Sequence, residues 1–230
     1  ILIVFLLVSS MLVLVVQPTT AKEKEKDFIS LAYVSLSLLN MHKMQASEVK
    51  DLLDRYNWRG ISDVALIGGI FMTGQDASIM VSWEKKSWPA VYEGVDYKGD
   101  PIDEQRQRDM LCSKKVVREV IKYFKKKKID IWLCQTAYGW LTGGSLGVVL
   151  EDHEKTLLYA QRLNHFAREL GCIGLDFDWE FPPTARQAQG YRELMQESKR
   201  LGMKVSVCAI QPTVDKAYQD NCFPDNAGVN

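Results

Sequence analysis

The chain has 230 residues, 47% of them hydrophobic, and its 29 basic side chains balance its 29 acidic ones. This composition predicts one soluble globular domain with a sizeable core. A net charge of zero argues against a polyanionic partner, so we expect no binding to nucleic acid. The basic run at 125–128 is interpreted as the cationic end of a helix.

Residues 1–16 form a nearly unbroken apolar run, and a charged run begins at Lys22. The pattern predicts a signal peptide over residues 1–21, with cleavage after the small residue Ala21. Because the chain begins with Ile and has no basic segment before the apolar run, we expect its true start to be missing. Sixteen apolar residues are fewer than the roughly 20 of a spanning helix, and a membrane anchor is the alternative. We expect a secreted or extracytoplasmic protein without stable membrane insertion after processing.

Strand and helix patterns alternate along the rest of the chain. The predicted strands cover 28–38, 61–71, 129–135, 174–182 and 203–210. Helices are predicted from Ser47 to the residue before Gly60, from Ser113 through Phe124, over 152–170, and from Thr184 through Met195. The buried stripe of the longest helix is predicted to hold Leu158, Leu163, Phe166, Ala167 and Leu170.

Two stretches lack a helical or strand period. Residues 72–112 are expected to be a functional loop or to carry small elements of their own. Trp83, Trp88, Tyr92 and Tyr97 in it could stack on sugar rings, or could only anchor the loop. The stretch 139–147 is predicted to be a glycine-rich loop, and it lacks the glycine spacing that cradles phosphates, so no nucleotide cofactor is expected.

The five cysteines and three histidines show no metal-ligand spacing. Cys134 and Cys208 fall inside predicted strands, where a free Cys behaves as a small buried hydrophobe. Because the cysteine count is odd, we do not expect a disulfide-built scaffold. The histidines are expected to be surface or packing residues, and no cofactor or metal is predicted.

The predicted strand at 174–182 carries three carboxylates at alternate positions. Asp176, Asp178 and Glu180 therefore share one face of the strand at spacings of roughly 6–7 Å, while apolar residues such as Trp179 share the other. Flanking helices favour a parallel strand covered on both faces, so the acids must point into a cleft or a barrel interior. A purely acidic, covered row indicates a functional site.

This strand resembles the active-site strand of glycoside hydrolase family 18, the chitinases and endo-β-N-acetylglucosaminidases, whose signature is Asp-Gly-x-Asp-x-Asp-x-Glu. Gly174, Asp176, Asp178 and Glu180 match the signature, and Ile173 stands at the position of the first Asp. The resemblance implies that Glu180 is the general acid, that Asp178 orients the substrate acetamido group, and that Asp176 tunes Asp178.

The resemblance also implies substrate contacts at two further strand ends. The family carries Ser-x-Gly-Gly near the end of its third strand, where Thr136 replaces the Ser and Tyr138 the first Gly. We predict Tyr138, Gly139 and Gln211 as substrate-binding residues. A purely structural strand end with a turn glycine is an equal alternative at the first of these places.

Repeated βα units predict either a doubly wound sheet or a (β/α)8 barrel. Inward acids favour the barrel, whose reactive groups gather at the C-terminal strand ends, and the resemblance implies the same fold. We predict an α/β fold, a (β/α)8 TIM barrel of which about the first five βα units are present, with residues 22–230 ending before the sixth strand. This part alone is expected to leave an open sheet edge and to aggregate.

The expected function is that of a secreted glycoside hydrolase. It would cleave β-1,4 bonds next to N-acetylglucosamine, in chitin, chitooligosaccharides or the N-glycan core, by substrate-assisted retaining acid catalysis. The full-length protein is expected to be a monomer. Because of Ile173, a catalytically weakened or inactive carbohydrate-binding member of the fold is the alternative. A third possibility is that the three acids bind a hard cation.

Overall fold

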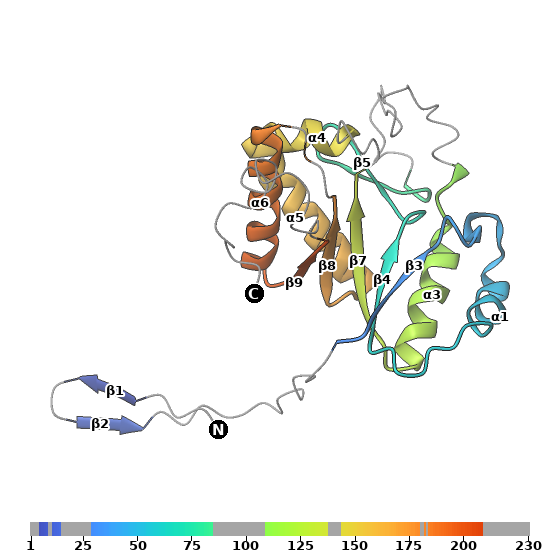
Figure 1. The fold of residues 1–230 in the computed structure, drawn as a ribbon, viewed down its shortest axis with the longest axis horizontal. Coiled ribbons are helices and arrows are strands. Elements are labelled where there is room, and N and C mark those ends of the chain that lie inside the picture. The colour runs from blue at the N-terminus through green and yellow to red at the C-terminus, as the bar shows by residue number, and fades with distance from the viewer. Residues whose placement is uncertain are drawn as a thin grey trace, which may run out of the picture.

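A curved parallel sheet forms the centre of the fold (Figure 1). The computed structural model describes residues 5–8, 11–14, 29–84, 109–137, 144–179, 182 and 184–208. The sheet contains five parallel strands, β3 (Leu31–Ser35), β4 (Asp63–Ile67), β7 (Asp130–Thr136), β8 (Gly174–Asp178) and β9 (Lys204–Val207). Each predicted strand is therefore present. β7 has the predicted length and is shifted by one residue, and the other four strands are shorter than their apolar patterns.

Helices connect successive strands of this sheet. They are α1 (Val49–Leu53), α3 (Lys114–Lys126), α4 (Gly144–Leu150), α5 (His153–Leu170) and α6 (Ala185–Arg200), with the 3-10 turns η1 (Met41–Lys43) and η2 (Ala46–Glu48) before α1. The strands β5 (Met72–Thr73) and β6 (Ile79–Met80) pair as a small antiparallel hairpin after β4. The stretch 72–112 thus begins with an element of its own, while 85–108 lies outside the described residues.

The strand order across the sheet is the same as the order along the chain. A doubly wound sheet would reverse its order at a switch point. Here every crossover moves in one direction, and right-handed crossovers in one direction place all the helices on the same face. This is the winding of a (β/α)8 barrel, so the predicted fold class is confirmed for the described part of the chain, which holds five strands and the four helical connections between them.

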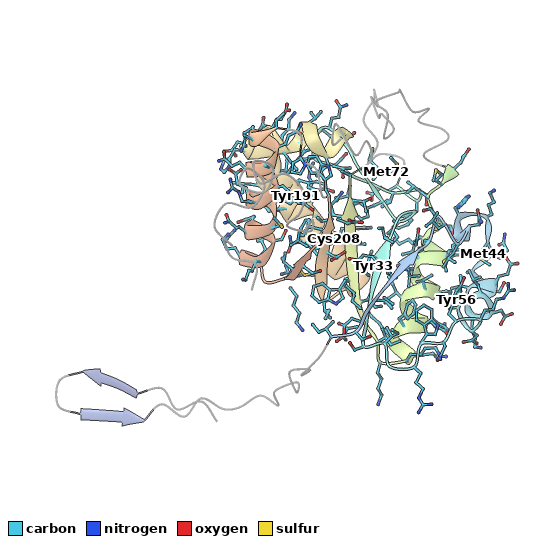
Figure 2. All side chains as sticks on the ribbon, in the orientation of Figure 1. Tyr33, Met44, Tyr56, Met72, Tyr191 and Cys208 are labelled. Atoms are coloured by element: carbon cyan, nitrogen blue, oxygen red, sulfur yellow. The ribbon has the colours of Figure 1, made fainter. Side chains whose placement is uncertain are left out.

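A contact between the two outer strands shows how strongly the sheet curves. The Tyr33 hydroxyl on β3 lies 3.1 Å from the Cys208 Sγ, directly after β9. Figure 2 labels both residues. In a flat sheet, four strand spacings would separate these strands by about 19 Å. The sheet therefore curls toward its helix-free face, which corresponds to the interior of a barrel.

The two faces of the sheet bury different side chains. The helix-facing side holds the main core, with Leu66, Leu133 and Leu175 fully buried. Each such side chain contributes about 1.5–3 kcal/mol to folding. The inner face holds a small separate cluster, in which Ala65, Trp132 and Cys134 are buried and Leu31, Ile67 and Ile173 pack against them. The carboxylates of β8 lie on this inner face.

Three helices begin at the cap residue that the sequence predicts. The side chains of Ser113, Asp152 and Thr184 each accept a hydrogen bond from a backbone N–H of the first turn. Ser47, in contrast, is not a cap. The backbone N–H of Gln45 donates to the Glu48 carboxylate at 2.7 Å, so a capping box starts the turn upstream and places Ser47 inside η2.

Two further predictions were wrong. Residues 144–150 form α4 instead of a glycine-rich loop, because Leu146, Val149 and Leu150 are buried and tertiary packing outweighs the low helix propensity of glycine. Leu158 was predicted to lie on the buried face of α5, but it is 38% exposed. The neighbouring Tyr159 is buried instead. The Tyr159 hydroxyl bonds Thr73 at 2.7 Å, which fixes this rotation of the helix.

The N-terminal apolar run contains a separate pair of strands. β1 (Phe5–Val8) and β2 (Met11–Leu14) form an antiparallel hairpin that pairs with no strand of the central sheet. The cleavage position Ala21 lies outside the described residues, so the signal peptide stays a prediction. Within the described part of the chain, no helix has the length and apolar character required to cross a membrane.

Candidate active site

Two of the predicted carboxylates lie side by side on the inner face of β8. Asp176 is 1% exposed, and its Oδ1 accepts a hydrogen bond from the Ser206 hydroxyl on β9 at 2.5 Å. Its Oδ2 has no hydrogen-bond partner among the described residues. Asp178 is half-buried and ends β8, so it lies at the C-terminal edge of the sheet, where barrel enzymes place reactive groups.

A hydroxyl and a thiol connect the two carboxylates. The Tyr33 hydroxyl lies 3.1 Å from the Cys208 Sγ and is also close enough to the Asp176 carboxylate to feel its charge. The Cys208 thiol in turn bonds Asp178. Burial raises the pKa of Cys208 to about 11, so the thiol keeps its proton at neutral pH and can donate it to Asp178. Four side chains, Tyr33, Asp176, Asp178 and Cys208, thus form one row of polar groups.

The pKa of Asp178 is raised above the usual range of an aspartate. Burial is the largest cause, the hydrogen bond from Cys208 opposes it, and the nearby charge of Asp176 adds to it. Burial also raises the pKa of the Tyr33 hydroxyl, and the contacts with Cys208 and Asp176 add to that rise. Tyr33 therefore stays neutral over the range in which carboxylates titrate.

A tryptophan forms the floor of the inner face beneath the acids. The Trp132 Nε1 donates to Asp63 Oδ1 at 2.9 Å, which fixes the indole across β4, β7 and β8. A Cβ at Gly174 would lie 2.3 Å from the indole Cε3. The glycine of the acidic motif is therefore required by the close approach of the Trp132 ring.

We expect Gly174→Ala to lower the free energy of unfolding by about 1–3 kcal/mol, as is typical of overpacking in a core. Urea denaturation followed by circular dichroism measures the change. The control is the same substitution in a Trp132→Ala background, where the space is open and the cost should nearly vanish. An equal cost in both backgrounds would contradict the assigned contact.

The outer face of the same strand end is held by aromatic packing. Trp179 is fully buried, and its ring meets Tyr191 of α6 edge to face, with centroids 5.6 Å apart. The backbone N–H of Trp179 donates to the Tyr191 hydroxyl at 3.1 Å. The prediction that Trp179 packs against a helix is confirmed. These contacts fix the backbone directly before Glu180.

The structure tests part of the predicted site. It brings Asp176 and Asp178 together, whereas Glu180, Tyr138, Gly139 and Gln211 lie outside the described residues and stay predictions. In the described ranges, no group of three or more His, Cys, Asp or Glu side chains could hold a metal ion. Glu180, the third acid, lies outside the described residues. An experiment therefore has to decide whether the three acids bind a cation.

Sequence reasoning missed three residues that lie against the acids, Tyr33, Ser206 and Cys208. Tyr33 lies on the strand at the opposite edge of the sheet, and only the curvature brings it to the acids. Ser206 and Cys208 alternate along β9 toward the inner face, as Asp176 and Asp178 do along β8. Cys208 was expected to be a buried hydrophobe and is instead half-buried and hydrogen-bonded. Period-two alternation of polar residues on β9 was the available signal.

No protein-family model and no curated protein matches the chain. Many of the solved structures similar to it are chitinases. One is a chitinase from Rhizomucor miehei, at 13% identity and a TM-score of 0.47 over 76% of this chain and 44% of that chain. Another is the family 18 chitinase ChiB from Flavobacterium johnsoniae, at 10% identity and a TM-score of 0.49 over 83% and 50%.

A third similar structure is the spore cortex-lytic enzyme SleL from Bacillus cereus, at 12% identity and a TM-score of 0.49 over 84% of this chain and 37% of that chain. The chain spans half or less of the length of these three solved chains. We therefore argue the function from the residues of the site.

Proposed function

We propose that the chain is part of a glycoside hydrolase that cleaves β-1,4 bonds next to N-acetylglucosamine. The observation that supports this most is the pair Asp176 and Asp178 on the inner, C-terminal end of β8, followed two positions later by Glu180 in the order of the family 18 signature. The substrate class is chitin, chitooligosaccharides or the core of N-glycans.

Each carboxylate has a different task in this reaction. Glu180 protonates the glycosidic oxygen while positive charge develops at the anomeric carbon. The substrate's own acetamido oxygen attacks that carbon, so the protein needs no carboxylate nucleophile. Asp178 accepts the acetamido N–H and stabilises the positive charge of the cyclic intermediate. Water then opens the intermediate, and Glu180, now ionised, takes a proton from that water.

The row of polar groups supports the role of Asp178. Burial raises the pKa of Asp178, and a carboxylate shielded from water interacts more strongly with a positive charge on the substrate. Tyr33 and Cys208 lie against the two carboxylates and hold them in place. The Ser206 hydroxyl fixes Asp176 by donating to its Oδ1.

The test is sugar release by the full-length protein from chitooligosaccharides and from an N-glycoprotein, followed by mass spectrometry. Release from one substrate establishes the reaction and selects its substrate. If neither substrate is cut and neither is bound, the proposed function is wrong. The protein is further proposed to be secreted, to be monomeric when full length and to bind no nucleic acid.

One observation favours a second candidate function. Ile173, at the position of the first motif Asp, packs against the apolar cluster of Trp132, Ala65 and Cys134. No carboxylate is present at this position to tune Asp178, so a protein of this kind would bind glycans without cutting them. Glycan binding without release would select this function, and Ile173→Asp would then be expected to restore cleavage.

Chelation separates acid catalysis from the cation alternative. We expect sugar release to be unchanged, within about twofold, after EDTA treatment and removal of the chelator by gel filtration, because the proposed mechanism uses only carboxylates and the substrate. Added Mg²⁺ or Ca²⁺ should likewise have no effect. A loss of activity that returns with either cation would instead identify the acids as metal ligands.

A further inference from the structure

A groove of about 600 Å³ separates α3 from α5 on the helix-covered side of the sheet. Elsewhere the helices pack on each other, α3 against α1 and α5 against α4 and α6. The charged residues that line the groove are five cations and one acid, Lys114, Arg118, Lys122, Lys125, Lys126 and Glu169. The volume is that of an ordinary ligand site.

Four of the cations form a stripe that is inclined to the axis of α3. Lys114, Arg118, Lys122 and Lys126 are spaced four residues apart, so each is about 6 Å from the next along the helix axis. Lys122 bonds Glu119 at 3.3 Å, but within the described ranges the other three have no ion-pair partner. Like charges at this spacing destabilise a helix by about 0.2–0.5 kcal/mol per pair. The stripe is therefore a cost to the fold that an anionic ligand would remove.

Aromatic and aliphatic side chains form the rest of the lining. The rings of Trp83 and Phe166 stack with centroids 6.4 Å apart and an interplanar angle of 30°, and Val117, Ile121 and Leu170 lie between the helices. The Ser82 hydroxyl donates to the Cys112 carbonyl at 2.6 Å, which places the neighbouring Trp83 beside the start of α3. At the other end of α3, Lys125 lies over Gly171, which caps α5.

We propose that this groove binds an acidic polysaccharide, a sugar chain that carries carboxylate or sulfate groups. Such a chain presents negative groups at intervals along an extended backbone, and the stripe presents cations at intervals of about 6 Å over about 18 Å. Flat apolar sugar faces pack on aromatic planes such as Trp83, and the Arg118 guanidinium can pair with a carboxylate or sulfate through two parallel hydrogen bonds.

The site is independent of the proposed catalysis. The groove lies between helices on one face of the sheet, whereas Asp176 and Asp178 lie on the other face. The whole chain has a net charge of zero, which is why composition argued against a polyanionic partner. The four cations gather on one side of α3 because they are four residues apart, and the net charge of the chain does not show such local clustering.

The test compares two double charge reversals in the full-length protein. Arg118→Glu with Lys122→Glu reverses the middle of the stripe. Lys43→Glu with Lys115→Glu makes the same change in net charge at exposed positions that do not line the groove. Isothermal titration calorimetry with a heparin-derived hexasaccharide measures binding, and maltohexaose, which has neither charge nor N-acetyl groups, is the neutral control. Equal melting temperatures ensure that both variants are folded.

We expect wild type to bind the sulfated hexasaccharide and not to bind maltohexaose. The stripe variant should bind the sulfated sugar about tenfold more weakly or worse, the control variant within about twofold of wild type. Affinity should fall when NaCl is raised from about 0.05 M to about 0.5 M. Trp83→Ala should weaken binding of the hexasaccharide and leave the much weaker binding of poly-L-glutamate unchanged.

Several outcomes would overturn the proposal. Equal losses in the two double variants would show binding by overall charge alone. Tighter binding of poly-L-glutamate or of a dodecameric oligonucleotide than of the hexasaccharide would assign the stripe to an acidic protein or a nucleic acid. An unchanged affinity of the stripe variant would remove the groove from consideration.

Discussion

Glu180→Gln should lower sugar release by about 10²-fold or more, because an amide cannot protonate the leaving oxygen. The variant should still bind chitooligosaccharide within a few-fold of wild type, since the shape of the site is preserved. Initial rates on chitooligosaccharides, with products quantified by mass spectrometry, give the ratio. A variant that retains more than a tenth of wild-type turnover would remove Glu180 from the role of general acid.

A matched control excludes a general effect of charge removal. Glu154→Gln makes the same chemical change in the exposed first turn of α5, far along the chain from β8. Its turnover should equal that of wild type. Comparable losses in the two variants would mean that the loss reports stability or net charge and not proton donation.

Asp178→Asn should lower turnover by about 10²-fold or more, and at the same time make the protein more stable at neutral pH. The loss of turnover follows because a neutral amide does not stabilise the positive charge of the cyclic intermediate. The gain in stability follows because burial raises the pKa of Asp178, which means that the folded state disfavours its ionised form. Activity assays and thermal unfolding of one variant measure both effects.

The gain in stability expected for Asp178→Asn should depend on pH. As the pH rises from the usual aspartate pKa of about 3.9 through the raised value in the fold, the unfolded chain loses a proton that the folded chain retains, so wild-type stability falls. Asn does not titrate, so the variant does not show this fall in stability. The melting temperature of the variant should therefore exceed that of wild type at pH 7 and converge with it below about pH 3.9.

Asp51→Asn is the control for stability, because Asp51 is exposed on α1. It should change the melting temperature little at either pH. If Asp178→Asn is instead the less stable protein at pH 7, the carboxylate stabilises the fold and the assigned effect of burial is wrong.

The sequence predicted the strands, most helix starts and the acidic row well, because each depends on local patterns. Alternation at period two placed Asp176 and Asp178 on one face of β8, and Ser113, Asp152 and Thr184 are cap residues whose effect is confined to one turn.

Features that depend on packing between elements were not predictable in the same way. The helix α4 exists because its apolar side chains fill a space against α5 and α6, where a Cβ at Gly190 would lie 2.1 Å from the Leu150 carbonyl oxygen. Tyr33 joins the acids only through the curvature of the whole sheet, across 175 positions of sequence. Contacts between elements that are distant in sequence leave no pattern in the residues around them.

The requirement for an N-acetyl group tests the proposed mechanism most directly. The rate of cleavage of a chitooligosaccharide would be compared with that of its fully de-N-acetylated counterpart, at equal concentration and by the same mass-spectrometric assay. We predict cleavage of the acetylated chain and a rate at least about 10²-fold lower for the deacetylated chain, because the attacking acetamido oxygen is then absent. Comparable cleavage of both chains would contradict substrate assistance and would require a nucleophile from the protein.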